Sequence, residues 1–464
     1  MMSFLTPLQD WRPSDTWIVV IGALVAMACA LPGCFLLLRK QSLMGDAISH
    51  TSLLGVVAAF FVSHWLVESH VISPATALSV RHVAMCVGAI VVGVLSAWMT
   101  ESLQKLGNVE SSAALGVVFT SVFALSLLLI RAFADNVHID LECVLYGEIV
   151  TAPMETVGGS TVPRAVVING VVLAINLLLT VLLFKELRLS AFDPALATTQ
   201  GIPAHVMHYG LMGVTAMTLV AAFESVGSIL VIAMLIIPPA TAYLLTDRLP
   251  RMIGLSLLIG ALSSALGHVS ALTLPSLIAN SVGISDVHDA STAGMMAAAA
   301  GFLFVSAMLL GPKYGLVSRI WHRLLLKLRI ASEDVLGGLY RFEESAPATA
   351  DVSLATERAA WLRSLITQTW LSRLATWILL RRGWLVGSGS EVRLTDTGRE
   401  AARTLVRSHR LWESFLAKHF VLGTGRFHES AEQVEHFLDG ELLAELDQDL
   451  DRPGVDPHGR AIPN

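Results

Sequence analysis

The sequence predicts an all-α polytopic membrane protein of eight or nine transmembrane helices, followed by a soluble and mostly helical domain. Hydrophobic residues make up 54% of the 464 residues and charged residues only 15%, whereas a soluble domain carries about 25% charged residues. Long apolar runs are confined to about the first 310 residues, and Asp and Glu become frequent after about residue 330. We therefore expect a membrane part over 1–330 and a soluble part over 331–464.

Nine apolar runs are long enough to cross about 30 Å of hydrocarbon. They lie near residues 17–38, 47–66, 82–99, 111–130, 164–184, 209–223, 226–246, 252–272 and 294–311. Only Glu224 and Ser225 separate the sixth run from the seventh. Eight crossings, with one broken helix, is therefore the alternative.

The Lys and Arg residues of the short loops predict that the N-terminus lies outside the inner membrane and that the C-terminal tail is cytoplasmic. With this orientation the inside segments hold Arg39, Lys40, Lys105, Lys185, Arg188, Arg248, Arg251, Lys313, Arg319, Arg323, Lys327 and Arg329. The outside segments hold only Arg12, Arg81, Arg131 and Arg164.

A carboxylate and an imidazole four residues apart, Asp46 and His50, stand at the start of the second run. On a helix this spacing places both on one face. Such a pair can bind one divalent ion, and oxygen with nitrogen suits manganese, iron or zinc. Ionisable groups inside spans are costly and usually face an interior pathway. The alternative is that Asp46 caps the span and that His50 is an interfacial histidine.

The segment 39–50 resembles the signature of metal-ion ABC-transporter permeases of the zinc, manganese and iron type. Further segments resemble that family's fourth span, extracytoplasmic loop, cytoplasmic loop and core, in that order: 113–120, 140–147, 185–201 and 226–242. The resemblance covers about 15–320 and implies import of a divalent metal ion, with Asp46 and His50 in the transport pathway. The partners it implies are an ATP-binding subunit, an extracytoplasmic metal-binding protein and a second permease chain.

The cytoplasmic loop 185–203 is long for a connection. Within it, Phe192, Asp193 and the following proline open a short helix that we expect to end near Gly201. The resemblance implies that this helix docks on the ATP-binding subunit, and the alternative is an ordinary connecting helix. The chain lacks the phosphate-binding motif Gly-x-x-x-x-Gly-Lys-Ser/Thr. We therefore expect that it is not an enzyme and that a separate subunit hydrolyses ATP.

The tail holds a second set of nitrogen and oxygen ligands. His409 and Glu413 are spaced i,i+4 on an expected helix, 397–419. A further expected helix, 429–445, follows His428 and carries Glu432, Glu435 and His436. Such a set could bind a divalent ion. The alternative is a solvated amphipathic face, although such a face usually mixes Lys and Arg with Glu.

Before these helices, the pattern predicts helices over 356–368 and 370–382 and a hairpin over 385–395, which is the order of a winged helix. The tail resembles the diphtheria-toxin-repressor type of iron- or manganese-dependent regulator at 333–340, 394–399 and 456–463. The resemblance implies a winged helix over about 331–396 and metal-binding and dimerisation helices over about 397–464.

By position, the resemblance assigns His409, Glu413 and His428 to one metal site of the tail. It assigns the other site to Asp334, Glu432, Glu435 and His436. The chain departs at Gly337, where manganese-type members carry a carboxylate. Glu432 stands where iron-type members carry a sulfur ligand. This difference favours manganese weakly as the metal of the tail. We expect no permanently bound cofactor: manganese, zinc or iron is the transported substrate and a ligand of the tail.

Whether the tail binds DNA is open. The expected recognition helix, 370–382, is apolar, and its tryptophans resemble core residues, although Arg373, Arg381 and Arg382 could contact phosphates. The first hypothesis is a permease whose tail senses metal. The second is a membrane-tethered or released metal-dependent transcriptional regulator. The third, a secondary carrier that needs no ATP, is disfavoured by the loop at 192–201.

Overall fold

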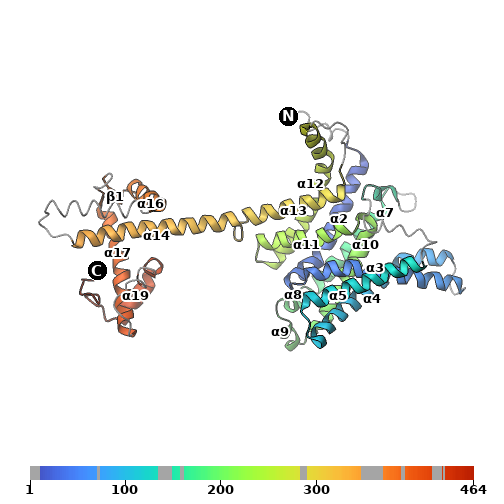
Figure 1. Ribbon diagram of the computed structural model, residues 1–464, viewed down its shortest axis with the longest axis horizontal. Coiled ribbons are helices and arrows are strands. Elements are labelled where there is room, and N and C mark those ends of the chain that lie inside the picture. The colour runs from blue at the N-terminus through green and yellow to red at the C-terminus, as the bar shows by residue number, and fades with distance from the viewer. Residues whose placement is uncertain are drawn as a thin grey trace. The chain divides into compact units, whose positions relative to one another are not determined.

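The computed structural model describes residues 11–69, 74–133, 149–156, 161–282, 290–345, 369–387, 392–420, 431 and 434–463. The chain forms two compact units, Met1–Ser318 and Arg319–Asn464 (Figure 1).

The first unit is helical. Its helices are α2 (Pro13–Leu38), α3 (Ser42–Glu68), α4 (Pro74–Gly107), α5 (Ser111–Phe133), α7 (Arg164–Leu182), α8 (Phe184–Phe192), α9 (Pro194–Thr199), α10 (Ala204–Val226), α11 (Ser228–Leu245), α12 (Leu249–Val282) and α13 (Thr292–Leu310), with the short 3-10 turn η2 (Ala152–Met154). Among the described residues, nine helices are long and apolar enough to cross a membrane. They coincide with the nine predicted runs and confirm the polytopic helical class.

The sixth and seventh runs are two helices, α10 and α11. The break between them is at Gly227, whose φ of +78° lies in a region that side-chain-bearing residues avoid. Glu224 belongs to the last turn of α10 rather than to a separate loop. The glycine therefore decides the count in favour of nine candidate spans.

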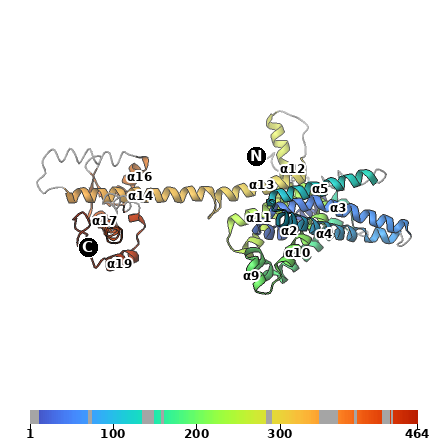
Figure 2. The same cartoon turned by 60° about the horizontal axis from the view of Figure 1, so that its bottom comes forward.

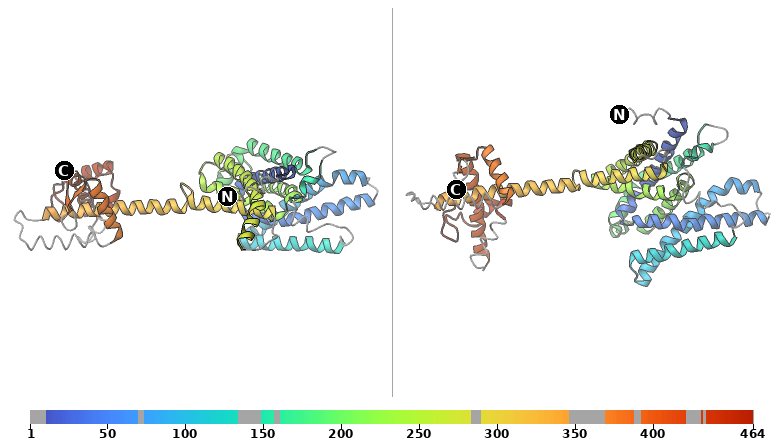
Figure 3. Two further views of the ribbon diagram at one scale, coloured as in Figure 1. Left: turned by 90° about the horizontal axis from the view of Figure 1, so that it is seen from above. Right: turned by 45° about the horizontal axis from the view of Figure 1, so that its top comes forward.

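Helix α2 is the most buried of the nine candidate spans and packs against α7, α11 and α12. It lies within the helical bundle of the first unit (Figure 2). Helices α3 and α4 run side by side (Figure 3), in close contact at Gly55 and Gly88. A Cβ atom added to Gly55 would lie 2.2 Å from the carbonyl oxygen of Gly88. Small residues at such crossings let helix backbones approach closely, which is how helices associate in membranes.

The second unit contains α16 (Trp370–Arg381), β1 (Leu385–Val386), β2 (Arg393–Leu394), α17 (Asp396–His419), the 3-10 turn η3 (Glu435–Phe437) and α19 (Gly440–Asp449). It also contains all but the first residues of α14 (Leu316–Ser345). Strands β1 and β2 pair antiparallel, with Leu385 opposite Leu394. A small apolar core joins α14, α16, α17 and this hairpin through Leu339, Leu379, Leu385 and Ala402.

The second helix and the hairpin of the expected winged helix are thus present in the described residues. The expected helix at 356–368 lies outside them.

One predicted helix of the tail is wrong. The range 429–445 does not form one helix, because the chain is extended at Leu438 and starts a new helix at Gly440. The side chain of Asp439 accepts a hydrogen bond from the backbone N–H of Leu442 at 2.9 Å. Aspartate favours this capping position, so it begins α19 and leaves Glu435 and His436 on the short turn η3.

Candidate transport and metal sites

Asp46 and His50 lie on one face of α3, as their spacing predicts. The Nε2 atom of His50 is 3.7 Å from Oδ1 of Asp46. Helix α3 begins at Ser42, and Gln41 occupies its N-cap position without a capping hydrogen bond from its side chain. Asp46 therefore sits inside the helix, and the alternative that it caps the span is wrong.

The ring of His50 packs against two aromatic rings of α5, Phe119 and Phe123, with centroids 5.3 Å apart in each case. Beside it lies a small cavity of about 30 Å³. Three serines are among the residues that line this cavity, Ser49 and Ser52 of α3 and Ser228 of α11, and the first two donate their hydroxyl hydrogen bonds to backbone carbonyls of α3. The cavity lies among α3, α5, α10 and α11, and its lining is mainly apolar, with the His50 ring at its border.

The expected short helix after Phe192 is present as α9. Asp193 caps it, because its Oδ1 accepts a hydrogen bond from the backbone N–H of Leu196 at 2.9 Å. Gly201 ends it with a φ of +81°. Phe192 is 63% exposed. The loop therefore presents an apolar ring beside α9, whose start is capped by Asp193 and whose end is set by Gly201.

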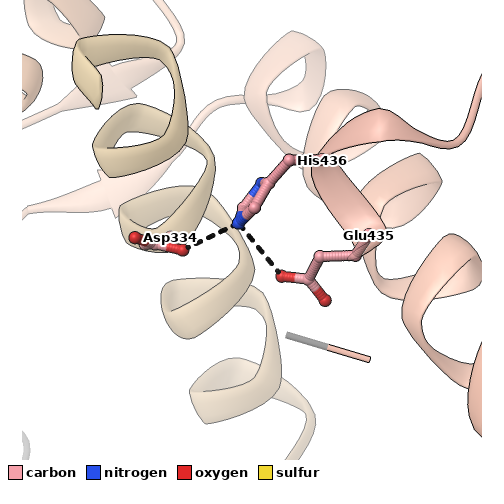
Figure 4. Close-up of side chains that lie close together, drawn as sticks. All are labelled: Asp334, Glu435 and His436. Atoms are coloured by element: carbon pink, nitrogen blue, oxygen red, sulfur yellow. Dashed lines mark ion pairs between the residues drawn. The ribbon is translucent and has the colours of Figure 1, made fainter. Parts of the chain in front are cut away.

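The second unit brings together three of the predicted ligands, Asp334 from α14 and Glu435 and His436 from η3. The Nε2 atom of His436 lies 3.3 Å from Oδ1 of Asp334 and 3.9 Å from Oε1 of Glu435 (Figure 4). One ligand atom from each residue lies within 4.8 Å of the others. Two carboxylates and one imidazole are donors that manganese, iron and zinc all accept, so these residues fit a divalent ion.

Glu333 orients this imidazole. The Nδ1 atom of His436 donates a hydrogen bond to Oε2 of Glu333 at 2.7 Å, which directs Nε2 toward Asp334 and Glu435. Burial favours the neutral ring, but the hydrogen bonds to Asp334 and Glu333 outweigh it and raise the pKa of His436 to about 9. In the ion-free protein this ring is therefore protonated at neutral pH.

The other predicted pair, His409 and Glu413, lies buried on α17. The Nε2 atom of His409 is 3.2 Å from Oε1 of Glu413, and its Nδ1 atom is 2.5 Å from Oε2 of Glu435. Burial lowers the pKa of His409, but the hydrogen bonds to Glu413 and Glu435 more than offset this and raise it above the ordinary value. Glu435 therefore belongs to both groups of ligands. The remaining predicted ligands, His428 and Glu432, lie outside the described residues.

Sequence reasoning missed two neighbours of these groups. Arg341 donates a hydrogen bond to Oε2 of Glu435 at 3.1 Å, and Nε2 of His458 is 3.8 Å from Oε1 of Glu413. His458 belongs to the segment 456–463 that resembles the regulator family. It is far from α17 along the chain, so its approach to Glu413 could not be predicted from the sequence. No signal in the sequence links Arg341 to a residue 94 positions away.

The expectation that the tryptophans of α16 are core residues is wrong. Trp370 and Trp377 are both exposed, and the guanidinium of Arg381 lies 4.2 Å from the centre of the Trp377 ring. Arg373 is exposed as well. One face of α16 is therefore both aromatic and basic.

Comparison with known families assigns most of the chain. The ABC 3 transport family matches residues 16–311. The family described as iron dependent repressor, metal binding and dimerisation domain matches residues 395–464.

Individual relatives agree with the family matches. The manganese transport system membrane protein MntD of Bacillus subtilis is 40% identical over 66% of this chain and 95% of its own length. The zinc transport system membrane protein TroD of Treponema pallidum is 39% identical over 82% of this chain and 96% of its own. The solved structure of PsaBC from Streptococcus pneumoniae in complex with Fab is 30% identical, with a TM-score of 0.50, over 68% of this chain and 98% of that one.

Proposed function

The chain belongs to the ABC 3 transport family, and we propose that it is the inner-membrane permease subunit of a transporter that imports a divalent transition-metal ion. The observation that carries the proposal is the Asp46–His50 pair on one face of α3, with His50 at the border of a small cavity within the helical unit. Relatives named as manganese, zinc and chelated iron transport proteins support the choice of substrate. Asp46 and His50 would then contact the ion as it crosses the membrane.

The transporter needs partners for this function. The chain carries no phosphate-binding motif for ATP, so an ATP-binding subunit supplies hydrolysis. We place its docking site at Phe192 and α9, because a capped helix and an exposed aromatic ring make a defined contact surface. An extracytoplasmic metal-binding protein delivers the ion, and a second permease chain completes the pathway.

We propose that the tail senses cytoplasmic metal. The permease part extends over 1–330, the winged helix over about 331–396, and the metal-binding and dimerisation part over about 397–464. An ion held by Asp334, Glu435 and His436 would join α14 to η3. Since α14 follows the last span directly in the chain, metal binding in the tail would stiffen the helix that leaves the permease.

Metal uptake by cells tests the transport function. Asp46→Asn and His50→Gln should each abolish uptake of radiolabelled manganese and zinc, while the chain still inserts and co-purifies with its ATP-binding subunit. The matched control is His64→Gln, which changes another histidine of α3 that is exposed and far along the helix. Normal uptake by the Asp46 and His50 variants would remove the pair from the pathway.

The alternative function is a membrane-tethered or released metal-dependent transcriptional regulator. The exposed face of α16 favours it, since Arg373 and Arg381 could contact phosphates. Footprinting on the DNA upstream of the transporter genes, with the full chain in nanodiscs and excess manganese, separates the two. Protection that is lost in Arg373→Gln/Arg381→Gln would support the regulator.

A further inference from the structure

The first half of α14, residues 316–330, is here called the juxtamembrane segment. Five residues separate its start at Leu316 from the end of α13 at Leu310. It lies beyond the transport family match, which ends at 311, and before the repressor match, which begins at 395. Neither family match therefore accounts for it.

The juxtamembrane segment has one apolar face. Helical spacing of three and four residues aligns Val317, Ile320, Trp321, Leu324 and Leu328 along it. The first four of these side chains are exposed in the structure, Trp321 most of all. At about 1.5 Å per residue the segment is about 22 Å long. Its exposed apolar side chains therefore form a continuous stripe rather than isolated surface residues.

The other side of the segment is basic. Arg319, Arg323 and Lys327 follow one another at intervals of four residues, whereas Arg329 pairs with Glu333 of the same helix, with 2.9 Å between Nε and Oε1. From Gly311 to Ser332 the chain contains five Lys and Arg residues but no Asp or Glu. A solvent-exposed helix that is stabilised by salt bridges along its own length would alternate Lys and Arg with Asp and Glu.

We propose that the juxtamembrane segment lies in the interface of the cytoplasmic leaflet, with its apolar face among the lipid chains and its basic side on anionic headgroups. Basic amphipathic helices with tryptophan at the boundary bind membranes in this way. The inference rests on the proposed cytoplasmic position of the tail. A second copy of the chain fits less well as the occupant, because pairing the apolar faces of two such helices would bring their unbroken positive charge together.

The proposal gives α14 two roles. The helix continues without a break from the juxtamembrane segment to Asp334, one of the metal ligands. Anchoring the segment at the bilayer surface would hold the first helix of the tail at a fixed depth. The ion would then bind between a lipid-anchored helix and η3.

Spin labels on the full chain test the depth of the segment. In a background that lacks the four native cysteines, single labels are attached at Leu324→Cys on the apolar face and Leu326→Cys on the basic side. The two positions are matched, since their side chains are 37% and 42% exposed in the structure. In nanodiscs that contain phosphatidylglycerol, the label at 324 should be relaxed more by oxygen, and the label at 326 more by a water-soluble nickel complex. Equal access of the nickel complex to both labels overturns the proposal.

The contribution of charge to membrane binding is tested by introducing Arg319→Gln/Arg323→Gln/Lys327→Gln into each of the two labelled chains. Each basic residue near an anionic surface strengthens binding about fivefold, so the contrast between the labels should collapse in this variant. It should also weaken for the unaltered segment in nanodiscs of neutral phosphatidylcholine. Protection of residue 324 that appears only when the ATP-binding subunit is added assigns the face to that protein and overturns the lipid assignment.

Metal uptake measured with the same chains separates the two proposals. If uptake is normal and the nickel complex reaches both labels equally, only the proposed lipid contact is refuted. Absence of uptake by the chain with its native cysteines, in the presence of all partners, counts against the transport function instead.

Discussion

His409 of α17 donates a hydrogen bond from Nδ1 to Oε2 of Glu435 in η3, at 2.5 Å. The second carboxylate oxygen of Glu435 faces His436, with 3.9 Å between Oε1 and Nε2. Both histidines and Glu435 are buried, and a buried charge must be paired. One carboxylate therefore joins two groups of ligands that come from different elements.

Removing Glu435 and His436 together should abolish metal binding by the tail. Glu435→Ala/His436→Ala deletes two of the three ligand atoms that lie together, so calorimetric titration of the full chain with manganese or zinc should lose the tail component. Zinc should bind the unmodified tail more tightly than manganese, as the order of divalent affinities predicts. Glu445→Ala, which changes an exposed carboxylate of α19, is the control. Unchanged binding by the double variant would show that the ligands are elsewhere.

Replacing Arg341 should strengthen metal binding. Its guanidinium contacts Oε2 of Glu435 at 3.1 Å and places a positive charge beside the site for a cation. Arg341→Gln should raise manganese affinity about tenfold, which corresponds to about 1.4 kcal/mol less repulsion. Arg341→Lys keeps the charge and should change affinity little. A loss of affinity in Arg341→Gln would mean that the arginine orients Glu435 for the ion.

Metal binding by the tail should depend on pH in a window that reaches well above 7. Coordination requires the neutral imidazole, whereas the raised pKa of His436, about 9, keeps the ring protonated in the ion-free protein. Affinity should therefore rise from pH 6 to about 9, about tenfold per unit where one proton is displaced. Calorimetry in buffers of different ionisation enthalpy should count about one proton released per ion. No proton release at pH 7 would contradict this assignment.

The same shift has the opposite effect on the ion-free fold. A histidine whose pKa is raised on folding contributes stability fully below its unfolded pKa, about 6.5, and loses that contribution as pH rises through its folded value. The ion-free tail should thus become less stable between about pH 6.5 and 9. Thermal unfolding of the chain with a metal chelator, compared with Glu333→Gln/His436→Gln, should show this loss only in the unmodified protein.

Loss of the cap on α9 should weaken coupling to the ATP-binding subunit. Asp193→Ala removes the hydrogen bond to the N–H of Leu196 and should cost about 1 kcal/mol of local helix stability. Gly201→Ala forces a side chain into φ +81°, at a similar cost. Together they should reduce co-purification of the ATP-binding subunit or uncouple ATP hydrolysis from uptake. Asp193→Asn, which can still cap the helix, should behave normally, and full coupling in Asp193→Ala/Gly201→Ala would place the contact elsewhere.

Features that depend on neighbouring residues could be predicted from the sequence. The spans were predictable because hydrocarbon requires an unbroken apolar run of about 20 residues. The pairing of Asp46 with His50 was predictable because residues four apart share a face on any helix. The short helix after Asp193 followed from its capping residue and proline.

Contacts between distant segments depended on the tertiary structure. The helix predicted over 429–445 is broken because helix propensity is a weak preference and the cap at Asp439 overrides it. The hydrogen bonds of Glu435 reach His409, 26 residues away, and Arg341, 94 residues away. Charge and spacing could propose the ligands, but only the packing of α14 and α17 against η3 decides which atoms meet, because that packing is set by the burial of the whole core rather than by any local pattern.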